Sequence, residues 1–241
     1  MQLNTKGQMT YTVDLVFCID ATGSMAPILK AVKENALSFY SDLMKVLNEK
    51  NKRVESVRIK LIAFRDYIAD GEEAMLVTDF FNLPEQAVEF SNTVNGITHF
   101  GGGDIPEDSL EALAYAIRSD WSQSGTKRRQ IIVLWSDAPP HPLGFAKGKS
   151  DNYPSGMAAN FAELTEWWEN EQLGYVNRRA KRLILYAPAT DIERGYDVET
   201  VYPWNNVVEN WNNVVHFPSV AGKGLEEFQY EEILSAIVQS I

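Results

Sequence analysis

The sequence predicts an α/β fold: a doubly wound, mostly parallel six-stranded sheet with one antiparallel edge strand and helices on both faces. Short apolar runs alternate with segments of helical periodicity, an order typical of parallel strands joined by right-handed crossovers. Residues 13–19 form a near-continuous apolar run, which indicates a strand buried on both faces. Residues 57–64 and 74–81 flank the turn-forming pair Asp70-Gly71, so we expect an antiparallel hairpin at the sheet edge.

The remaining elements follow in order along the chain. Pro27 suits a first helical turn, and apolar residues recur at helical spacing from Ile28 to Val46, so the pattern predicts one long amphipathic helix. The last helix has an apolar face that includes Ile233 and Ile237, and we expect it to dock on the body of the protein. The other expected elements are helices at 84–94, 110–117, 157–172 and 204–211 and strands at 130–135, 183–187 and 214–217.

Composition limits the class of protein. The chain has 241 residues, 45% of them apolar, and we expect one domain over residues 1–241, with residues 1–11 as a flexible or edge segment. The formal charge of −11 disfavours nucleic acid as a partner. No signal-like or membrane-spanning run is visible, and the single cysteine, Cys18, lies within an apolar run. We therefore expect a cytoplasmic protein; its oligomeric state is not indicated.

Three acidic loops are expected to meet at one edge of the sheet. Asp20 ends the first strand and begins an Asp-x-Thr-x-Ser run, a glycine-rich loop carries Asp104 and Glu107, and Asp137 follows the strand at 130–135. In open α/β sheets, sites form beyond the carboxyl ends of the strands. Carboxylates and hydroxyls gathered there are hard oxygen ligands, which suit Mg²⁺ and also Mn²⁺ or Ca²⁺. The sequence therefore predicts a divalent cation site.

These loops resemble those of von Willebrand factor A domains with a metal-ion-dependent adhesion site, and the resemblance extends over nearly the whole chain. It is carried by Asp-Ala-Thr-Gly-Ser at 20–24, Gly-Gly-Asp-Ile-Pro-Glu at 102–107 and Ser-Asp-Ala-Pro-Pro-His at 136–141. The resemblance implies that Asp20, Thr22, Ser24 and Asp137 are metal ligands, directly or through water. It further implies that the cation binds an Asp or Glu of a partner protein.

The middle loop resembles that of integrin beta-subunit I-like domains. By this resemblance Glu107 faces the first cation, and Asp104 is either an alternative ligand or a ligand of a second, neighbouring cation; Thr98 is a further candidate. We take Gly23, Met25 and His141 as candidates for contact with the partner. The long loop at 139–156 is expected to contribute specificity. In the family, the last helix can move with the site, which makes residues 226–241 a candidate two-state element.

The same residues admit other interpretations. An aspartate after a strand can simply form a turn and cap a helix, and acidic residues at 104 and 107 can simply favour a helix N-terminus. Among enzymes, the serine hydrolase and dinucleotide-binding patterns are not matched. Since no nucleophile and base pair is evident, we expect a binding module and not an enzyme. The alternative is a metal-dependent phosphoryl-transfer or phosphoester-hydrolysing enzyme that uses Asp20 and Mg²⁺.

Overall fold

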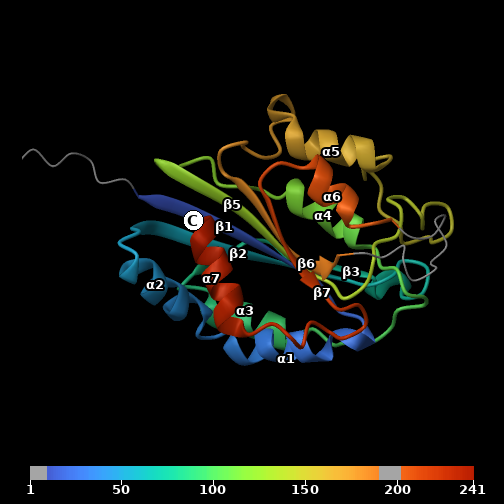
Figure 1. Cartoon of the computed structure of the whole chain (residues 1–241), viewed down its shortest axis with the longest axis horizontal. Coiled ribbons are helices and arrows are strands. Elements are labelled where there is room, and N and C mark those ends of the chain that lie inside the picture. The colour runs from blue at the N-terminus through green and yellow to red at the C-terminus, as the bar shows by residue number, and fades with distance from the viewer. Residues whose placement is uncertain (1–9, 190–201) are drawn as a thin grey trace, which may run out of the picture.

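A mostly parallel sheet runs through the computed structural model, which describes residues 10–189 and 202–241 (Figure 1). In these residues the sheet has seven strands in the order β3-β2-β1-β5-β6-β7, and β4 also pairs with β2. β1 is central, with parallel neighbours on both sides, and the predicted α/β fold class is confirmed. The expected count of six strands with one antiparallel strand is wrong for the described residues, because the antiparallel edge is divided into two short strands. The strands are β1 Tyr11–Asp20, β2 Val54–Phe64, β3 Met75–Val77, β4 Phe81–Leu83, β5 Lys127–Trp135, β6 Lys181–Pro188 and β7 Val214–Ser219.

The antiparallel edge consists of two short strands. β3 pairs with residues 62–64 of β2, and β4 pairs with residues 57–59 of the same strand. Between them the backbone N–H of Leu61 donates to Thr78 Oγ1 at 3.0 Å, so a side chain replaces a rung of the ladder. The predicted antiparallel pairing with β2 is therefore present, but the edge is interrupted.

Helices cover both faces of the sheet (Figure 1). α1, α2, α3 and α7 pack on one face, and α4, α5 and α6 pack on the other. In the part of the chain that the structure describes, no helix has the length and apolar character needed to cross a bilayer. The helices are α1 Ala26–Asn35, α2 Phe39–Glu49, α3 Ala87–Gly96, α4 Ser109–Ile117, α5 Phe161–Glu169, α6 Asn205–Asn210 and α7 Tyr230–Ser240, with 3₁₀ turns η1 Gly23–Met25, η2 Gly71–Glu73 and η3 Glu171–Leu173.

The single long helix expected up to residue 46 is wrong, because a turn at residues 36–38 separates α1 from α2. Polar side chains form local hydrogen bonds around this turn. Asn35 Nδ2 donates to the carbonyl of Ala31 at 2.8 Å, and Ser38 Oγ donates to Asp42 Oδ2 at 2.9 Å. Such side chains offer the backbone an alternative to a continuous helix, which apolar periodicity alone does not reveal.

β1 is buried on both faces, as its apolar run predicts. Alternate side chains of a strand point to opposite faces. Leu15 and Phe17 therefore join the layer of α1 and α7, whereas Val16 and Cys18 join the layer of α4. Burial raises the pKa of the Cys18 thiol well above its ordinary value. The expectation for residues 1–11 falls mostly outside the described residues, and Tyr11 is the first residue of β1.

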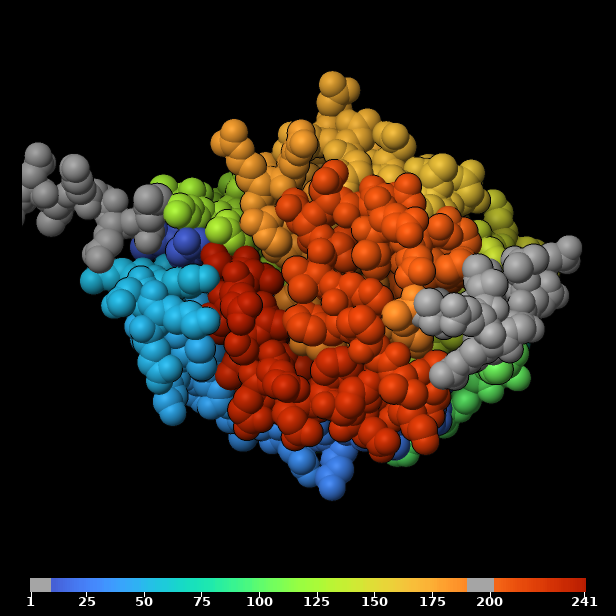
Figure 2. Space-filling view, in the orientation of Figure 1, coloured from blue at the N-terminus to red at the C-terminus, as the bar shows by residue number. Residues whose placement is uncertain are grey.

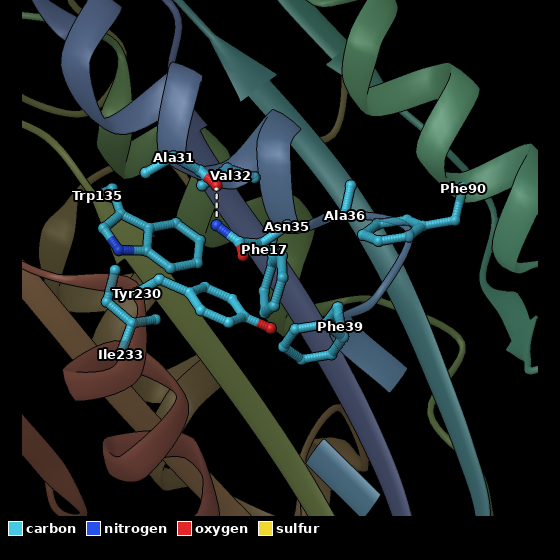
Figure 3. A pocket seen from close by; sticks show the side chains of 10 residues that line it. All are labelled: Phe17, Ala31, Val32, Asn35, Ala36, Phe39, Phe90, Trp135, Tyr230 and Ile233. Carbon is cyan, nitrogen blue, oxygen red and sulfur yellow. Dashed lines mark hydrogen bonds between the residues drawn. The ribbon is translucent and has the colours of Figure 1, made fainter. Parts of the chain in front are cut away.

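The last helix is docked, as predicted. Figure 2 shows α7 in dark red across the face seen there. Ile237 is fully buried, and the carbonyl of Ile241 accepts a hydrogen bond from Arg129 Nε at 3.0 Å. Tyr230 and Ile233 of α7, together with side chains of α1, α2, α3 and the sheet, line an apolar cavity of about 20 Å³ (Figure 3). Because its apolar face and its C-terminal carbonyl are both engaged, α7 belongs to the core of the fold.

Candidate metal centre

The first loop is organised by Asp20, the last residue of β1. Its side chain is fully buried. Asp20 Oδ1 accepts hydrogen bonds from the backbone N–H and the hydroxyl of Thr22, at 2.9 and 2.6 Å, and Oδ2 accepts one from Ser136 Oγ at 2.8 Å. Asp20 thus positions Thr22 and connects the first loop to the residue that precedes Asp137.

Asp137 joins the third loop to two other segments. Its Oδ1 accepts a hydrogen bond from Ser24 Oγ at 2.9 Å, and its Oδ2 accepts one from the backbone N–H of Gly224 at 2.7 Å. The hydroxyl of the first loop and the carboxylate of the third loop are therefore already in contact. Gly224 belongs to the connection between β7 and α7, so this connection also contacts Asp137.

The middle loop brings a buried carboxyl group, Glu107, to the site. Glu107 is 3% exposed, and its Oε2 has no hydrogen-bond partner among the described residues. Its backbone is held by the third loop, since Glu107 N donates to Pro139 O at 3.1 Å and His141 N donates to Glu107 O at 2.9 Å. A Cβ added to Gly102 would lie 3.0 Å from Glu107 Oε1 and 3.5 Å from Thr22 Cγ2, so glycine allows this close approach.

These residues surround one open cleft of about 340 Å³. The predicted site residues that line it come from all three loops, and Asp20 lies behind Thr22. The lining residues are Thr22, Gly23, Ser24, Gly101, Gly102, Asp104, Ile105, Glu107, Asp137, Ala138, Ala221 and Gly222.

The other predicted site residues lie elsewhere. Thr98 lines a separate hollow beside Arg65. Met25 is fully buried in the layer of α1, because the 3₁₀ turn points it inward. His141 is also fully buried, beside Asp66 and Asp104. Of the three residues expected to contact a partner, only Gly23 is exposed at the cleft.

Burial raises the pKa values of two acidic side chains of the site. It raises the pKa of Asp20 to about 6, although the hydrogen bonds from Thr22 act in the opposite direction. Burial, followed by the charges of Asp20 and Asp66, raises the pKa of Glu107 to about 11. Each carboxyl group therefore resists ionisation unless a positive charge is placed beside it.

Stabilisation of the protein by Mg²⁺ should increase between about pH 5 and about pH 8. The folded-state pKa values of Asp20 and Glu107 lie above the unfolded ones, so without a cation folding favours the protonated forms. The metal-free protein then loses stability as pH rises from 3.8 to about 6 for Asp20 and from 4.5 towards about 11 for Glu107. A cation favours the ionised forms and offsets this loss. The measurement is the melting temperature with Mg²⁺ and with chelator at each pH; an unchanging difference would contradict it.

Arg65 and Asp66 are functional candidates that sequence reasoning missed. Arg65 Nε donates to the carbonyls of Ala21 at 3.1 Å and Phe100 at 3.2 Å, while its other nitrogens donate to the carbonyls of Glu73 and Thr98. The guanidinium thus ties the first loop to the middle loop. An Arg-Asp pair directly after the apolar run at 57–64 was the available signal, since it marks the carboxyl end of a neighbouring strand.

Replacing Gly224 by alanine should destabilise the protein by about 1–3 kcal/mol, in the range of other overpacking changes. Gly224 has φ +60°, and an added Cβ would lie 2.3 Å from the carbonyl oxygen of Ser24 and 2.7 Å from Pro27 Cδ. Gly222→Ala is the matched control, because Gly222 also has positive φ but an added Cβ would have open space. Denaturant unfolding of both variants tests the prediction, and equal losses would contradict the role of the contact with Ser24.

Comparison with known proteins places these features in a family. The model of the von Willebrand factor A domain matches residues 14–141. The alpha-protein kinase vwkA of Dictyostelium discoideum is 27% identical over 144 residues, which are 60% of this chain and 21% of the kinase. A putative ariadne-like RING finger protein of Acanthamoeba polyphaga mimivirus is 26% identical over 143 residues, 58% of this chain and 12% of that protein. The chain therefore spans only a small part of the length of either relative.

Solved structures show the same fold. The pilus adhesin SpaC of Lactobacillus rhamnosus GG superposes with a TM-score of 0.55 at 11% identity, covering 97% of this chain and 31% of the adhesin. A von Willebrand factor type A protein of Catenulispora acidiphila gives a TM-score of 0.52 at 12% identity, covering 96% of this chain and 43% of that one. At these identities the similarity concerns the fold.

Proposed function

This chain belongs to the von Willebrand factor A domain family, and we propose that it is a protein-interaction module whose cleft holds a divalent cation and binds an acidic side chain of a partner. Thr22, Ser24, Glu107 and Asp137 would hold the ion, with Asp20 positioning Thr22. Mg²⁺ suits this set of hard oxygens, and Mn²⁺ or Ca²⁺ would substitute. Such an ion supplies a point of positive charge that attracts one outside oxygen.

The observation that carries the proposal is the buried, unpartnered Oε2 of Glu107 beside a cleft lined with hydroxyls and a carboxylate. Nearly all buried polar groups in proteins have a partner, so an exception needs an explanation. A bound cation provides one, since it would satisfy the carboxylate of Glu107. The fold shared with a pilus adhesin agrees with an interaction role.

The protein's own acids decide how strongly a partner carboxylate is attracted. Asp20 and Asp137 together balance a divalent charge, and an ionised Glu107 would make the centre net negative. Because burial raises the pKa of Glu107 to about 11 in the absence of a cation, the ion must displace the proton of Glu107 before this carboxylate becomes a ligand. The residues that surround the opening, including Gly23 and Ile105, would contact the partner around the bound side chain.

The test compares protein capture by the full chain in Mg²⁺ and in chelator, together with calorimetric titration of Mg²⁺ alone. We expect Mg²⁺ to bind, and the captured proteins to be released by chelator. Ser24→Ala should weaken both effects, whereas Ser155→Ala, at an exposed serine away from the cleft lining, should not. Absence of Mg²⁺ binding, or capture that chelator does not change, would overturn the proposal. Mg²⁺-dependent phosphoester turnover that Asp20→Ala abolishes would instead favour an enzyme.

A further inference from the structure

A histidine and two aspartates meet behind the middle loop. His141 Nε2 lies 3.6 Å from Asp66 Oδ2 and 3.3 Å from Asp104 Oδ1. Each of the three side chains offers one potential ligand atom, and these three atoms all lie within 4.8 Å of one another. Asp66 and His141 are buried, whereas the side chain of Asp104 is 49% exposed, so the cluster is open to solvent on one side only.

The backbone around the cluster fixes the orientation of its side chains. Asp66 Oδ1 accepts the backbone N–H groups of Ile68 at 2.6 Å and Ala69 at 3.3 Å, which leaves Oδ2 facing His141. The imidazole of His141 stacks on the ring of Phe145, with 4.3 Å between centroids and 10° between planes. The end of β2 and the long loop at 139–156 therefore each supply one oriented group, and the middle loop supplies the more exposed Asp104.

The glycine-rich loop is packed closely against this cluster. A Cβ added to Gly103 would lie 2.8 Å from the Cβ of Ala69 and 3.6 Å from Asp66 Oδ2. Glu107, on the same loop, is within electrostatic range of both Asp20 and Asp66. Its unpartnered carboxyl oxygen therefore lies in a region of concentrated negative charge that reaches from the cleft to the cluster.

The donor set differs from that of the cleft. Mg²⁺ and Ca²⁺ take oxygen ligands, whereas imidazole together with carboxylates suits Mn²⁺, Fe²⁺, Co²⁺ and Zn²⁺. A protonated histidine between two aspartates would also balance charge. That arrangement would give the same ion-pair distances, so metal binding by the three side chains is the property that separates the two interpretations.

We propose that Asp66, Asp104 and His141 hold a second cation of the first-row transition series, separate from the ion of the cleft. The proposal deepens the proposed function, since both positions share the middle loop, but it does not require that a partner carboxylate binds. It assigns Asp104 to the second position and leaves Glu107 as the middle-loop ligand of the first. The two ions then differ in chemical class.

The test counts ions bound to the chelator-treated full chain in separate titrations with Co²⁺, Zn²⁺ and Mg²⁺. We expect two equivalents of Co²⁺ or Zn²⁺ and one of Mg²⁺, and a visible Co²⁺ absorption band that reports the imidazole ligand. His141→Asn should weaken one Co²⁺ site by about 10- to 100-fold or more and remove that band, while the increase in melting temperature caused by Mg²⁺ remains. His99→Asn is the control, since His99 is exposed and outside the cluster.

A second variant is needed because His141 is buried, and a His141→Asn protein that fails to fold would also lose metal binding. Asp104→Asn changes an exposed side chain and should also weaken the second Co²⁺ site. Ser24→Ala should weaken the first site and leave the second one unchanged. One equivalent of Co²⁺ in the wild type, or two equivalents kept in both His141→Asn and Asp104→Asn, would overturn the inference. Loss of Mg²⁺-dependent partner capture with both Co²⁺ sites intact would contradict only the proposed function.

Discussion

Replacing Asp20 by asparagine should lower the affinity for Mg²⁺ by about 10- to 100-fold and yet make the metal-free protein more stable at pH 7. The two effects have one cause. The carboxylate of Asp20 is fully buried, and burial raises its pKa from 3.8 to about 6. At pH 7 its ionised form therefore costs up to about 3 kcal/mol of folding stability. Asparagine carries no charge, and its oxygen can still accept the hydrogen bonds from Thr22.

Two measurements check this prediction: calorimetric titration with Mg²⁺, and urea unfolding in chelator at pH 7. Asp79→Asn is the matched control, since it removes the same charge from an exposed residue at the sheet edge. We expect the control to change neither quantity appreciably. An Asp20→Asn protein that keeps the wild-type affinity for Mg²⁺ would remove Asp20 from the site. A variant less stable than wild type in chelator would show that the carboxylate is needed for the fold itself.

Replacing Arg65 by alanine should destabilise the protein by about 3–5 kcal/mol. Arg65 is 5% exposed, and its guanidinium donates to carbonyls of the first loop, the middle loop and the segment before β3. The guanidinium also lies over the ring of Phe100, with Arg65 Cζ 4.1 Å from the centroid. Alanine would remove the side-chain donor from all four carbonyls, and among them the carbonyl of Ala21 would keep the backbone N–H of Phe100 as a donor. Because the middle loop would lose its anchor, the affinity for Mg²⁺ should fall as well.

Unfolding by urea and titration with Mg²⁺ measure the two effects. Arg65→Lys keeps the charge but not the forked arrangement of donors, so it should restore only part of the stability. Arg53→Ala, at an exposed arginine, should change the stability by less than about 0.5 kcal/mol. Full rescue by lysine would show that charge, and not the set of carbonyl contacts, is what Arg65 provides.

The sequence predicts the part of the site that depends on local pattern. An apolar run followed by Asp20, Thr22 and Ser24 indicates a strand end, and acidic loops after other strands indicate the same edge of the sheet. The structure brings Thr22, Ser24, Glu107 and Asp137 to one cleft, in agreement with that reasoning. The α/β fold is predicted for the same reason, because periodicity and strand order are local signals.

The remaining features depend on contacts between distant segments. Met25 follows the exposed Ser24 directly, and only the 3₁₀ turn shows that it faces the core. His141 belongs to a loop rich in proline and glycine, and its burial comes from Phe145 and the middle loop. Arg65 donates to backbone carbonyls, which every residue has, so residue types do not reveal these contacts. Position in the tertiary structure, and not residue type, decides the role of each of these side chains.

The order of the strands in the sheet determines where the cleft forms. Asp20 and Ser136 are 116 residues apart along the chain, and their side chains are in contact because β1 lies beside β5. The information that defines the cleft is therefore distributed over nearly half of the sequence. A peptide that copies any one loop would keep the residue pattern and lose the convergence. The cleft exists only when β1 is placed between β2 and β5, so it is a property of the topology.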